Sequence, residues 1–122
     1  MIGYVTLGTN DLPRAAAFYD SLLAEMGAKR LWDFGKAIAL GVSQDKPSLG
    51  ITQPYDGKPA TVGNGVMVAF LVDSKEKVDR IYRKALELGG KDEGPAGPRS
   101  EGFYAGYFRD LDGNKLNVFF MG

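Results

Sequence analysis

The sequence predicts a single α+β domain that is made of two copies of one strand–helix–strands module. Two observations carry this prediction. Each half of the chain opens with an alternating apolar segment and continues with apolar residues at three- and four-residue spacing. A shift of 63 positions also superposes the first half on the second. With 122 residues, the chain is long enough to bury a core of its own.

The first module begins with a predicted strand at residues 4–8, where apolar and smaller side chains alternate. Asn10 and Asp11 then offer side chains that can cap a helix, and Pro13 lies in the first turn, where its missing N–H costs little. An apolar stripe at helical spacing follows, and Gly27 ends the predicted helix. The stripe consists of Ala15, Phe18, Tyr19, Leu22, Leu23 and Met26.

The second module repeats this order without a gap. Under the 63-residue shift, the first strand, the polar cap, the helical stripe and the terminal glycine each find a counterpart. We therefore infer an internal duplication. The matched pairs are Val5 with Val68, Leu7 with Phe70, Asn10 with Asp73, Ala15 with Val78, Phe18 with Ile81, Tyr19 with Tyr82, Leu23 with Leu86, and Gly27 with Gly90.

The later strands of the two modules agree more loosely. Strands are predicted at residues 34–42 and 48–53 in the first module, and at residues 103–109 and 115–120 in the second. The last two are joined by residues 110–114, whose glycine and Asx side chains suit a tight hairpin turn.

Two further segments are predicted to be irregular. Residues 55–65 are rich in Gly, Pro and Asn and are predicted to link the modules. Residues 89–102 contain five glycines and two prolines and are predicted to form a mobile loop. Since neither module can close a core alone, the two are expected to pack together.

The composition excludes several classes of function. Fifteen basic residues balance fifteen acidic ones, so no net charge favours nucleic acid or an anionic membrane. Cysteine and histidine are both absent, which excludes disulfides, thiolate catalysis and the commonest metal ligand. No apolar run approaches the roughly 18 residues of a membrane helix, and the N-terminal pattern is not that of a signal peptide. We expect a cytoplasmic protein without a nucleic-acid or membrane partner.

The chain resembles the vicinal oxygen chelate superfamily, which includes glyoxalase I, extradiol dioxygenases and bleomycin-resistance proteins. The resemblance covers essentially the whole chain and implies a mixed sheet of two tandem βαβββ modules, at about 1–54 and 66–122, curled around an open ligand cup. It also implies a homodimer. The motifs that carry it are Val5-Thr6-Leu7-Gly8, Asn10-Asp11-Leu12, Ala17-Phe18-Tyr19, Val68-Ala69-Phe70 and Phe108-Arg109-Asp110-Leu111-Asp112-Gly113-Asn114.

The same resemblance implies four metal-ligand positions, two from the first strands and two from the last strands of the modules. They fall on Tyr4, Met67, Gly50 and Asn117, where metal-using members have His, Glu or Gln. Glycine has no donor, a thioether suits soft metals, and a phenol must lose a proton with an ordinary pKa of about 10. We therefore expect no metal and no other cofactor.

Without a metal, the implied cup is expected to bind an organic molecule. Strand parity puts Tyr4, Thr6, Met67, Asn117 and Phe119 in the cup, although the same side chains could equally fill a core.

Four further residues are candidates for the rim of the cup. Trp32, Tyr104 and Tyr107 combine an apolar ring with one polar atom, as a rim requires, but for each one alone packing is the better interpretation. The sequence leaves open which face residues 103–109 present to the cup. Arg99 could contact a carboxylate or phosphate, or could be a solvated loop residue.

Three functions are compatible with these residues. The first is a metal-independent protein that binds an unidentified small organic molecule and forms a homodimer. The second is an enzyme of the glyoxalase or dioxygenase type, either metal-free with Tyr4 or Glu101 in proton transfer, or with a metal site that the mapping misses. The third is an interaction protein whose dimer surface matters.

Overall fold

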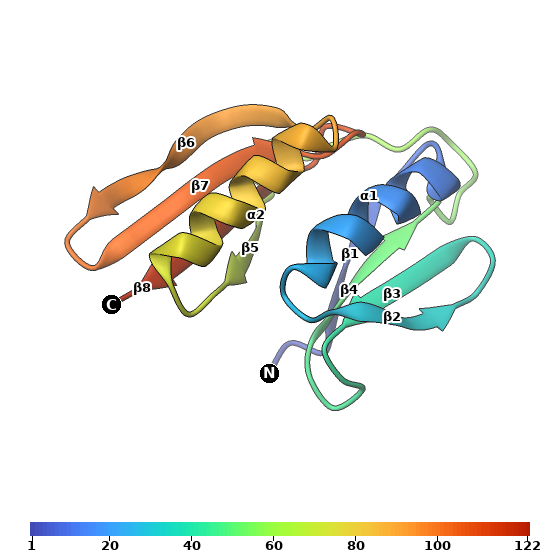
Figure 1. Ribbon diagram of the computed structural model, residues 1–122. Coiled ribbons are helices and arrows are strands. Elements are labelled where there is room, and N and C mark those ends of the chain that lie inside the picture. The colour runs from blue at the N-terminus through green and yellow to red at the C-terminus, as the bar shows by residue number, and fades with distance from the viewer. The chain divides into compact units, whose positions relative to one another are not determined.

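The structure is a computed structural model that describes all of residues 1–122 (Figure 1). The chain divides into two compact units, Met1–Val62 and Gly63–Gly122, called unit 1 and unit 2 below. Each unit contains one helix and four strands in the order βαβββ, as predicted. Neither helix has the length and apolar character needed to span a bilayer.

Unit 1 is a four-stranded mixed sheet with one helix. The strands lie in the order β1-β4-β3-β2, with β1 parallel to β4 and the other neighbours antiparallel. The α-helix packs on β2, β3 and β4, on one face of the sheet (Figure 1). The elements are β1 (Tyr4–Gly8), α1 (Leu12–Ala24), β2 (Lys29–Asp33), β3 (Ala37–Gly41) and β4 (Ser48–Thr52).

Unit 2 repeats this arrangement. Its strand order is β5-β8-β7-β6, with β5 parallel to β8, and its helix lies over β6, β7 and β8 (Figure 1). The elements are β5 (Val68–Leu71), α2 (Lys75–Glu87), β6 (Lys91–Ser100), β7 (Phe103–Arg109) and β8 (Lys115–Met121).

The two helices start and stop where the sequence indicates. The Asp11 side chain caps α1 by accepting a hydrogen bond from the backbone N–H of Arg14 at 3.1 Å. Ser74 caps α2 in the same way through the N–H of Lys77, at 3.2 Å. After α1 the chain turns at Gly27, whose φ of 75° favours glycine. Most of the predicted stripe is buried, namely Ala15, Phe18, Tyr19, Leu22 and Leu23.

Two strands differ from the sequence predictions. Lys29–Asp33 forms β2, an edge strand that was not predicted because its charged residues and a register shift between Arg30 and Trp32 break the apolar alternation. The predicted mobile loop at residues 89–102 contains the ten-residue edge strand β6. Three register shifts against β7 accommodate its glycines and prolines, and proline is tolerated in edge strands, where an N–H can be spared.

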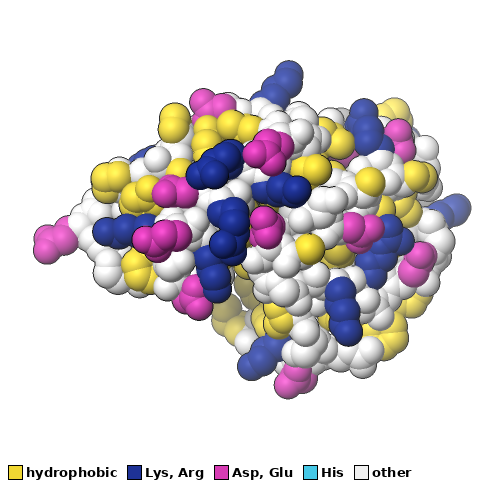
Figure 2. Space-filling model, in the orientation of Figure 1, with side chains coloured by type: hydrophobic (Ala, Val, Ile, Leu, Met, Phe, Trp, Pro, Cys, Tyr) yellow, Lys and Arg dark blue, Asp and Glu magenta, His cyan; other side chains and the backbone are white.

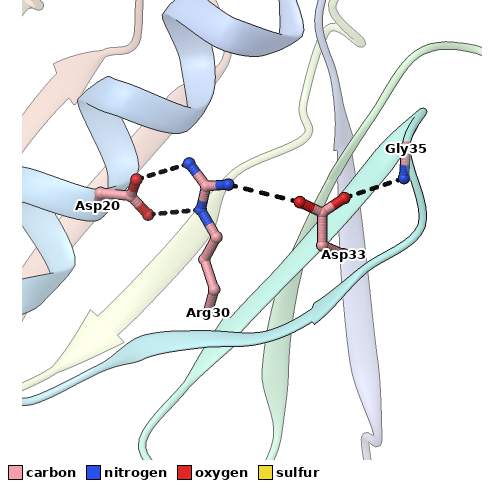
Figure 3. A network of polar contacts seen from close by, with 4 residues as sticks. All are labelled: Asp20, Arg30, Asp33 and Gly35. Atoms are coloured by element: carbon pink, nitrogen blue, oxygen red, sulfur yellow. Dashed lines mark hydrogen bonds and ion pairs between the residues drawn. The ribbon is translucent and has the colours of Figure 1, made fainter.

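A salt-bridge network joins β2 to α1 on the helix side of the unit 1 sheet (Figure 3). The Arg30 guanidinium donates to both carboxylate oxygens of Asp20, at 3.0 and 2.7 Å. Arg30 also lies 3.6 Å from Asp33, which accepts a hydrogen bond from the backbone N–H of Gly35. This bidentate pair holds the edge strand to the helix.

Strand register separates each sheet into a helix-covered face and a face turned away from the helix, called the open face below. In unit 1 the cross-strand row Leu7–Ile51–Ile38 is buried on the helix side. In unit 2 the helix side holds Phe108 and Val118, both fully buried. The open faces carry the neighbouring rows of each sheet, and some of their central residues, such as Ala105 and Asn117, are buried as well.

Candidate functional site

The open face of unit 1 has small residues in its middle and larger ones on its edge strands. One cross-strand row runs from Thr6 through Gly50 and Ala39 to Trp32. Trp32 is 48% exposed and its ring stacks on that of Phe34, with centroids 6.3 Å apart. Tyr4, on the opposite edge strand, is 72% exposed. The arrangement suits a flat apolar molecule, because backbone in the middle leaves room between aromatic edges.

The open face of unit 2 carries a polar group in its middle. Asn117 lies between Ala69 of β5 and Tyr107 of β7 in the register of the sheet. Its side chain is only 1% exposed, and its amide nitrogen Nδ2 has no hydrogen-bond partner. An unsatisfied buried donor costs about 1–3 kcal/mol, and such a group in a folded protein requires an explanation.

Two cations flank the ring of Tyr107 beside this amide. The guanidinium carbon of Arg99 lies 5.3 Å from the ring centre, and the ammonium of Lys115 lies 5.7 Å from it. The Arg99 side chain is fixed by a hydrogen bond to the carbonyl oxygen of Gly97 at 3.0 Å. Gly94 makes this possible, since a Cβ there would lie 3.3 Å from both Arg99 Nη2 and Tyr107 Cδ1.

These four side chains are called the Asn117 cluster below: Arg99, Tyr107, Lys115 and Asn117. Neither cation in the cluster is paired with a carboxylate, whereas neighbouring Arg109 is paired with Glu93 at 2.8 Å. The cluster therefore offers hydrogen-bond donors and positive charge next to an aromatic ring. Such a site favours an acceptor group of a ligand, above all a negatively charged one.

Tyr104 lies on the other face of β7. Its hydroxyl donates to Asp79 of α2 at 2.6 Å, and this hydrogen bond raises the pKa of Tyr104. Gly106 also faces α2, because a Cβ there would lie 3.0 Å from the ring of Tyr82. The parity that the sequence left open is thereby settled: Tyr107 lies on the open face and Tyr104 on the helix-covered face.

Tyr82 ties β6 to the same helix. Its hydroxyl donates to Asp92 of β6 at 2.7 Å. Burial, together with this hydrogen bond, raises the pKa of Tyr82 to about 12. The hydrogen bond from Tyr82 conversely lowers the pKa of Asp92. The contact holds the edge strand that carries Arg99.

The remaining candidates lie on the first and last strands. Thr6 is exposed on β1, Met67 directly precedes β5 and is 42% exposed, and Phe119 packs on Phe103 with ring centroids 5.6 Å apart. Phe119 shares the open face of unit 2 with Asn117, two residues before it on β8.

The four positions that correspond to metal ligands are divided between the units. Tyr4 and Gly50 lie on the open face of unit 1, while Met67 and Asn117 belong to unit 2. Nowhere in the chain do three His, Cys, Asp or Glu side chains come together. A catalytic divalent metal requires about three nitrogen or oxygen ligands, so the donors at these positions do not fit one.

Sequence reasoning missed a cleft of about 510 Å³ in unit 1. It is built from segments that are far apart in the sequence, which is why no local pattern indicates it. Ten residues line it: Thr9, Asn10, Lys36, Thr52, Gln53, Pro54, Tyr55, Gly57, Lys58 and Pro59.

The chain thus consists of two βαβββ units, each with one helix on a four-stranded mixed sheet. The chain belongs to the Glyoxalase/Bleomycin resistance protein/Dioxygenase superfamily, whose model matches residues 1–118. This confirms the resemblance that the motifs indicated. No curated protein matches the chain.

Solved structures agree with this assignment. A glyoxalase/bleomycin resistance protein from Albidiferax ferrireducens T118 is 30% identical, with a TM-score of 0.91 over 100% of this chain and 99% of that one. A lactoylglutathione lyase from Agrobacterium tumefaciens is 22% identical, with a TM-score of 0.70 over 98% and 92%. A genomically encoded fosfomycin resistance protein from Listeria monocytogenes is 20% identical, with a TM-score of 0.75 over 100% and 93%. The last two show likeness of fold alone.

Proposed function

We propose that this protein binds a small aromatic organic molecule on its open sheet faces without the help of a metal. The observation that carries the proposal is the buried Asn117 Nδ2, which has no partner within the chain. A ligand oxygen that reached this donor, after the side chains that cover it moved aside, would satisfy it and remove its desolvation cost. Tyr107, Arg99 and Lys115 would then hold a ring and an acceptor group of the same ligand.

The expected affinity is adequate for a binding protein. Burying about 300 Å² of apolar ligand surface contributes roughly 7 kcal/mol, before the cost of association takes a large share. The hydrogen bond to Asn117 adds about 1 kcal/mol. Together these contributions of about 8 kcal/mol correspond to a Kd of roughly 1 μM at best, and the cost of association makes the binding weaker than that.

A thermal-shift screen of the full chain tests this proposal. Aromatic carboxylates and amphipathic aromatic compounds are added to protein treated with EDTA, and hits are titrated by calorimetry. Binding to the metal-free protein that weakens about tenfold in Asn117→Leu supports the proposal. Asn64→Leu is the matched control, because the same change is made in an exposed turn.

Elemental analysis of protein purified without chelator provides the opposing result. Stoichiometric zinc, nickel, iron or manganese, together with loss of binding on chelation, would contradict metal-independent binding and favour an enzyme of the glyoxalase type.

We also propose that the protein forms a homodimer. Exposed apolar side chains in both units support this, among them Tyr4, Phe34, Leu71 and Met121. Light scattering after size-exclusion chromatography should give twice the 13.2 kDa mass of the chain. A monomer at tens of micromolar protein would contradict it.

A further inference from the structure

The cleft of unit 1 lies where several chain segments meet at one end of the sheet. Thr9 and Asn10 follow β1, Lys36 precedes β3, Thr52 ends β4, and residues 53–59 form the opposite wall. Its volume of about 510 Å³ is that of a site for a small ligand. None of its lining residues belongs to the Asn117 cluster.

The walls of the cleft are held by hydrogen bonds. The Asn10 carboxamide accepts from the backbone N–H of Ala60 at 2.6 Å and donates to its carbonyl oxygen at 3.2 Å. The N–H of Gln53 donates to the carbonyl oxygen of Lys36 at 2.9 Å. The close approach of the segment requires Gly8, because a Cβ there would lie 3.0 Å from the Cβ of Ala60. The cleft is thus a built feature of the fold.

The residues that line the cleft include basic side chains but no acidic ones. Lys36 and Lys58 are its only ionisable lining residues apart from the phenol of Tyr55, and neither lysine forms an ion pair. Two carboxylates lie next to lining residues in the sequence without lining the cleft themselves: Asp11 accepts from the N–H of Arg14, and Asp56 accepts from the N–H of Lys58. The residues that line the cleft therefore include two lysines and no aspartate or glutamate.

We propose that this cleft is a second binding site, for a small organic anion that carries a carboxylate or phosphate group. Lys36 and Lys58 bind the anionic group as point charges, and the exposed Gln53 carboxamide supplies a further donor. Pro54 and Pro59 contribute apolar surface to the cleft for the short organic remainder. The inference goes beyond the open-face function, since it concerns another place and other residues.

The test uses the ¹⁵N-labelled full chain and follows amide resonances in NMR titrations. The probes are acetate, inorganic phosphate, benzoate and phenyl phosphate, with benzamide as the neutral comparison. We expect the anions, but not benzamide, to shift the amides of Gln53, Gly57 and Lys58 in a saturable way. Comparison of acetate with phosphate tells which anionic group the cleft prefers.

Two double variants, each of which removes two positive charges, test whether the lysines of the cleft bind the anion. Lys36→Gln with Lys58→Gln should weaken binding at the cleft about tenfold. Lys29→Gln with Lys46→Gln, also exposed lysines of unit 1, should leave it unchanged. Equal weakening in both variants, or no saturable shift of the cleft amides, would overturn the proposal. Asn117→Leu should not affect these shifts, so failure here and failure of the open-face function are distinguishable.

Discussion

Units 1 and 2 have the same strand order and the same helix position, but they differ in what their open faces carry. In unit 1 the row Thr6–Gly50–Ala39–Trp32 puts its aromatic ring on an edge strand. In unit 2 the corresponding row Ala69–Asn117–Tyr107–Gly94 puts the ring and an amide in the middle of the sheet. The helix-covered faces are apolar in both units because both form a core, although Gly106 in unit 2 stands where unit 1 has Ile38.

Charged side chains of both signs occur in both units. Over the face shown in Figure 2, basic and acidic side chains are intermixed, as expected for a chain without net charge. The cations of the Asn117 cluster in unit 2 and of the cleft in unit 1 have no carboxylate partner, as is also true of exposed lysines such as Lys29 and Lys46. The duplication thus combines one backbone plan with two different open faces.

The largest losses in the free energy of unfolding are expected on the helix-covered faces, which form the core of both units. Phe108→Ala in unit 2 and Ile51→Ala in unit 1 should each lower the free energy of unfolding by about 3–4 kcal/mol, because both side chains are buried on the helix side. Thr6→Ala on an open face should change it by no more than about 0.5 kcal/mol. Urea denaturation measures all three, and equal losses would contradict the distinction between the faces.

Asn117→Leu should separate stability from binding. Removal of an unsatisfied buried donor should leave the free energy of unfolding unchanged or raise it by about 1 kcal/mol in the absence of ligand. Calorimetry should show weaker ligand binding in the same variant. A protein that loses several kcal/mol and binds as well as before would show that Asn117 is a structural residue.

Tyr82→Phe should weaken the attachment of β6 to α2 by about 1 kcal/mol, because the hydrogen bond to Asp92 is lost. The pKa of Tyr82 is raised to about 12, so the protonated phenol is favoured in the folded state. Its contribution is full below the unfolded pKa of about 10 and is lost as the pH rises through 12. Between these values the wild type should lose stability more steeply than Tyr82→Phe in urea titrations, and parallel curves would contradict the contact.

The smallest effect is expected at the network of β2. Asp20→Asn should cost no more than about 1 kcal/mol, since Arg30 and Asp20 are 40% and 41% exposed. The loss should shrink at 1 M salt, where exposed charges are screened. Asp33→Asn, which alters only the 3.6 Å contact, is the control and should cost less.

The sequence predicts the helices, the duplication and the family because these depend on local patterns. Asp11, Pro13 and the apolar stripe define α1 without reference to the rest of the chain. Strand β6 could not be predicted, since its glycines and prolines are typical of loops and only pairing with β7 makes it a strand. The face to which each side chain of β7 points also required tertiary contacts, because aromatic residues occur at both parities and only the contacts of Tyr104 and Gly106 with α2 distinguish them.

Among the candidate site residues, strand alternation could place Asn117 and Phe119 on one face of β8. It could not reveal that Asn117 is buried without a partner, which depends on its surroundings in the folded chain. The cleft at Lys36 and Lys58 was missed for a related reason, since hydrogen bonds between distant segments build it.

The most direct test of metal-independent binding is the ¹⁵N spectrum of the Asn117 side-chain amide in EDTA-treated protein. Addition of a screened aromatic ligand should shift this pair of resonances as Nδ2 gains an acceptor, with saturation at the calorimetric affinity. Resonances that stay in place while the ligand binds, or binding that returns only when a divalent metal is added, would contradict the account.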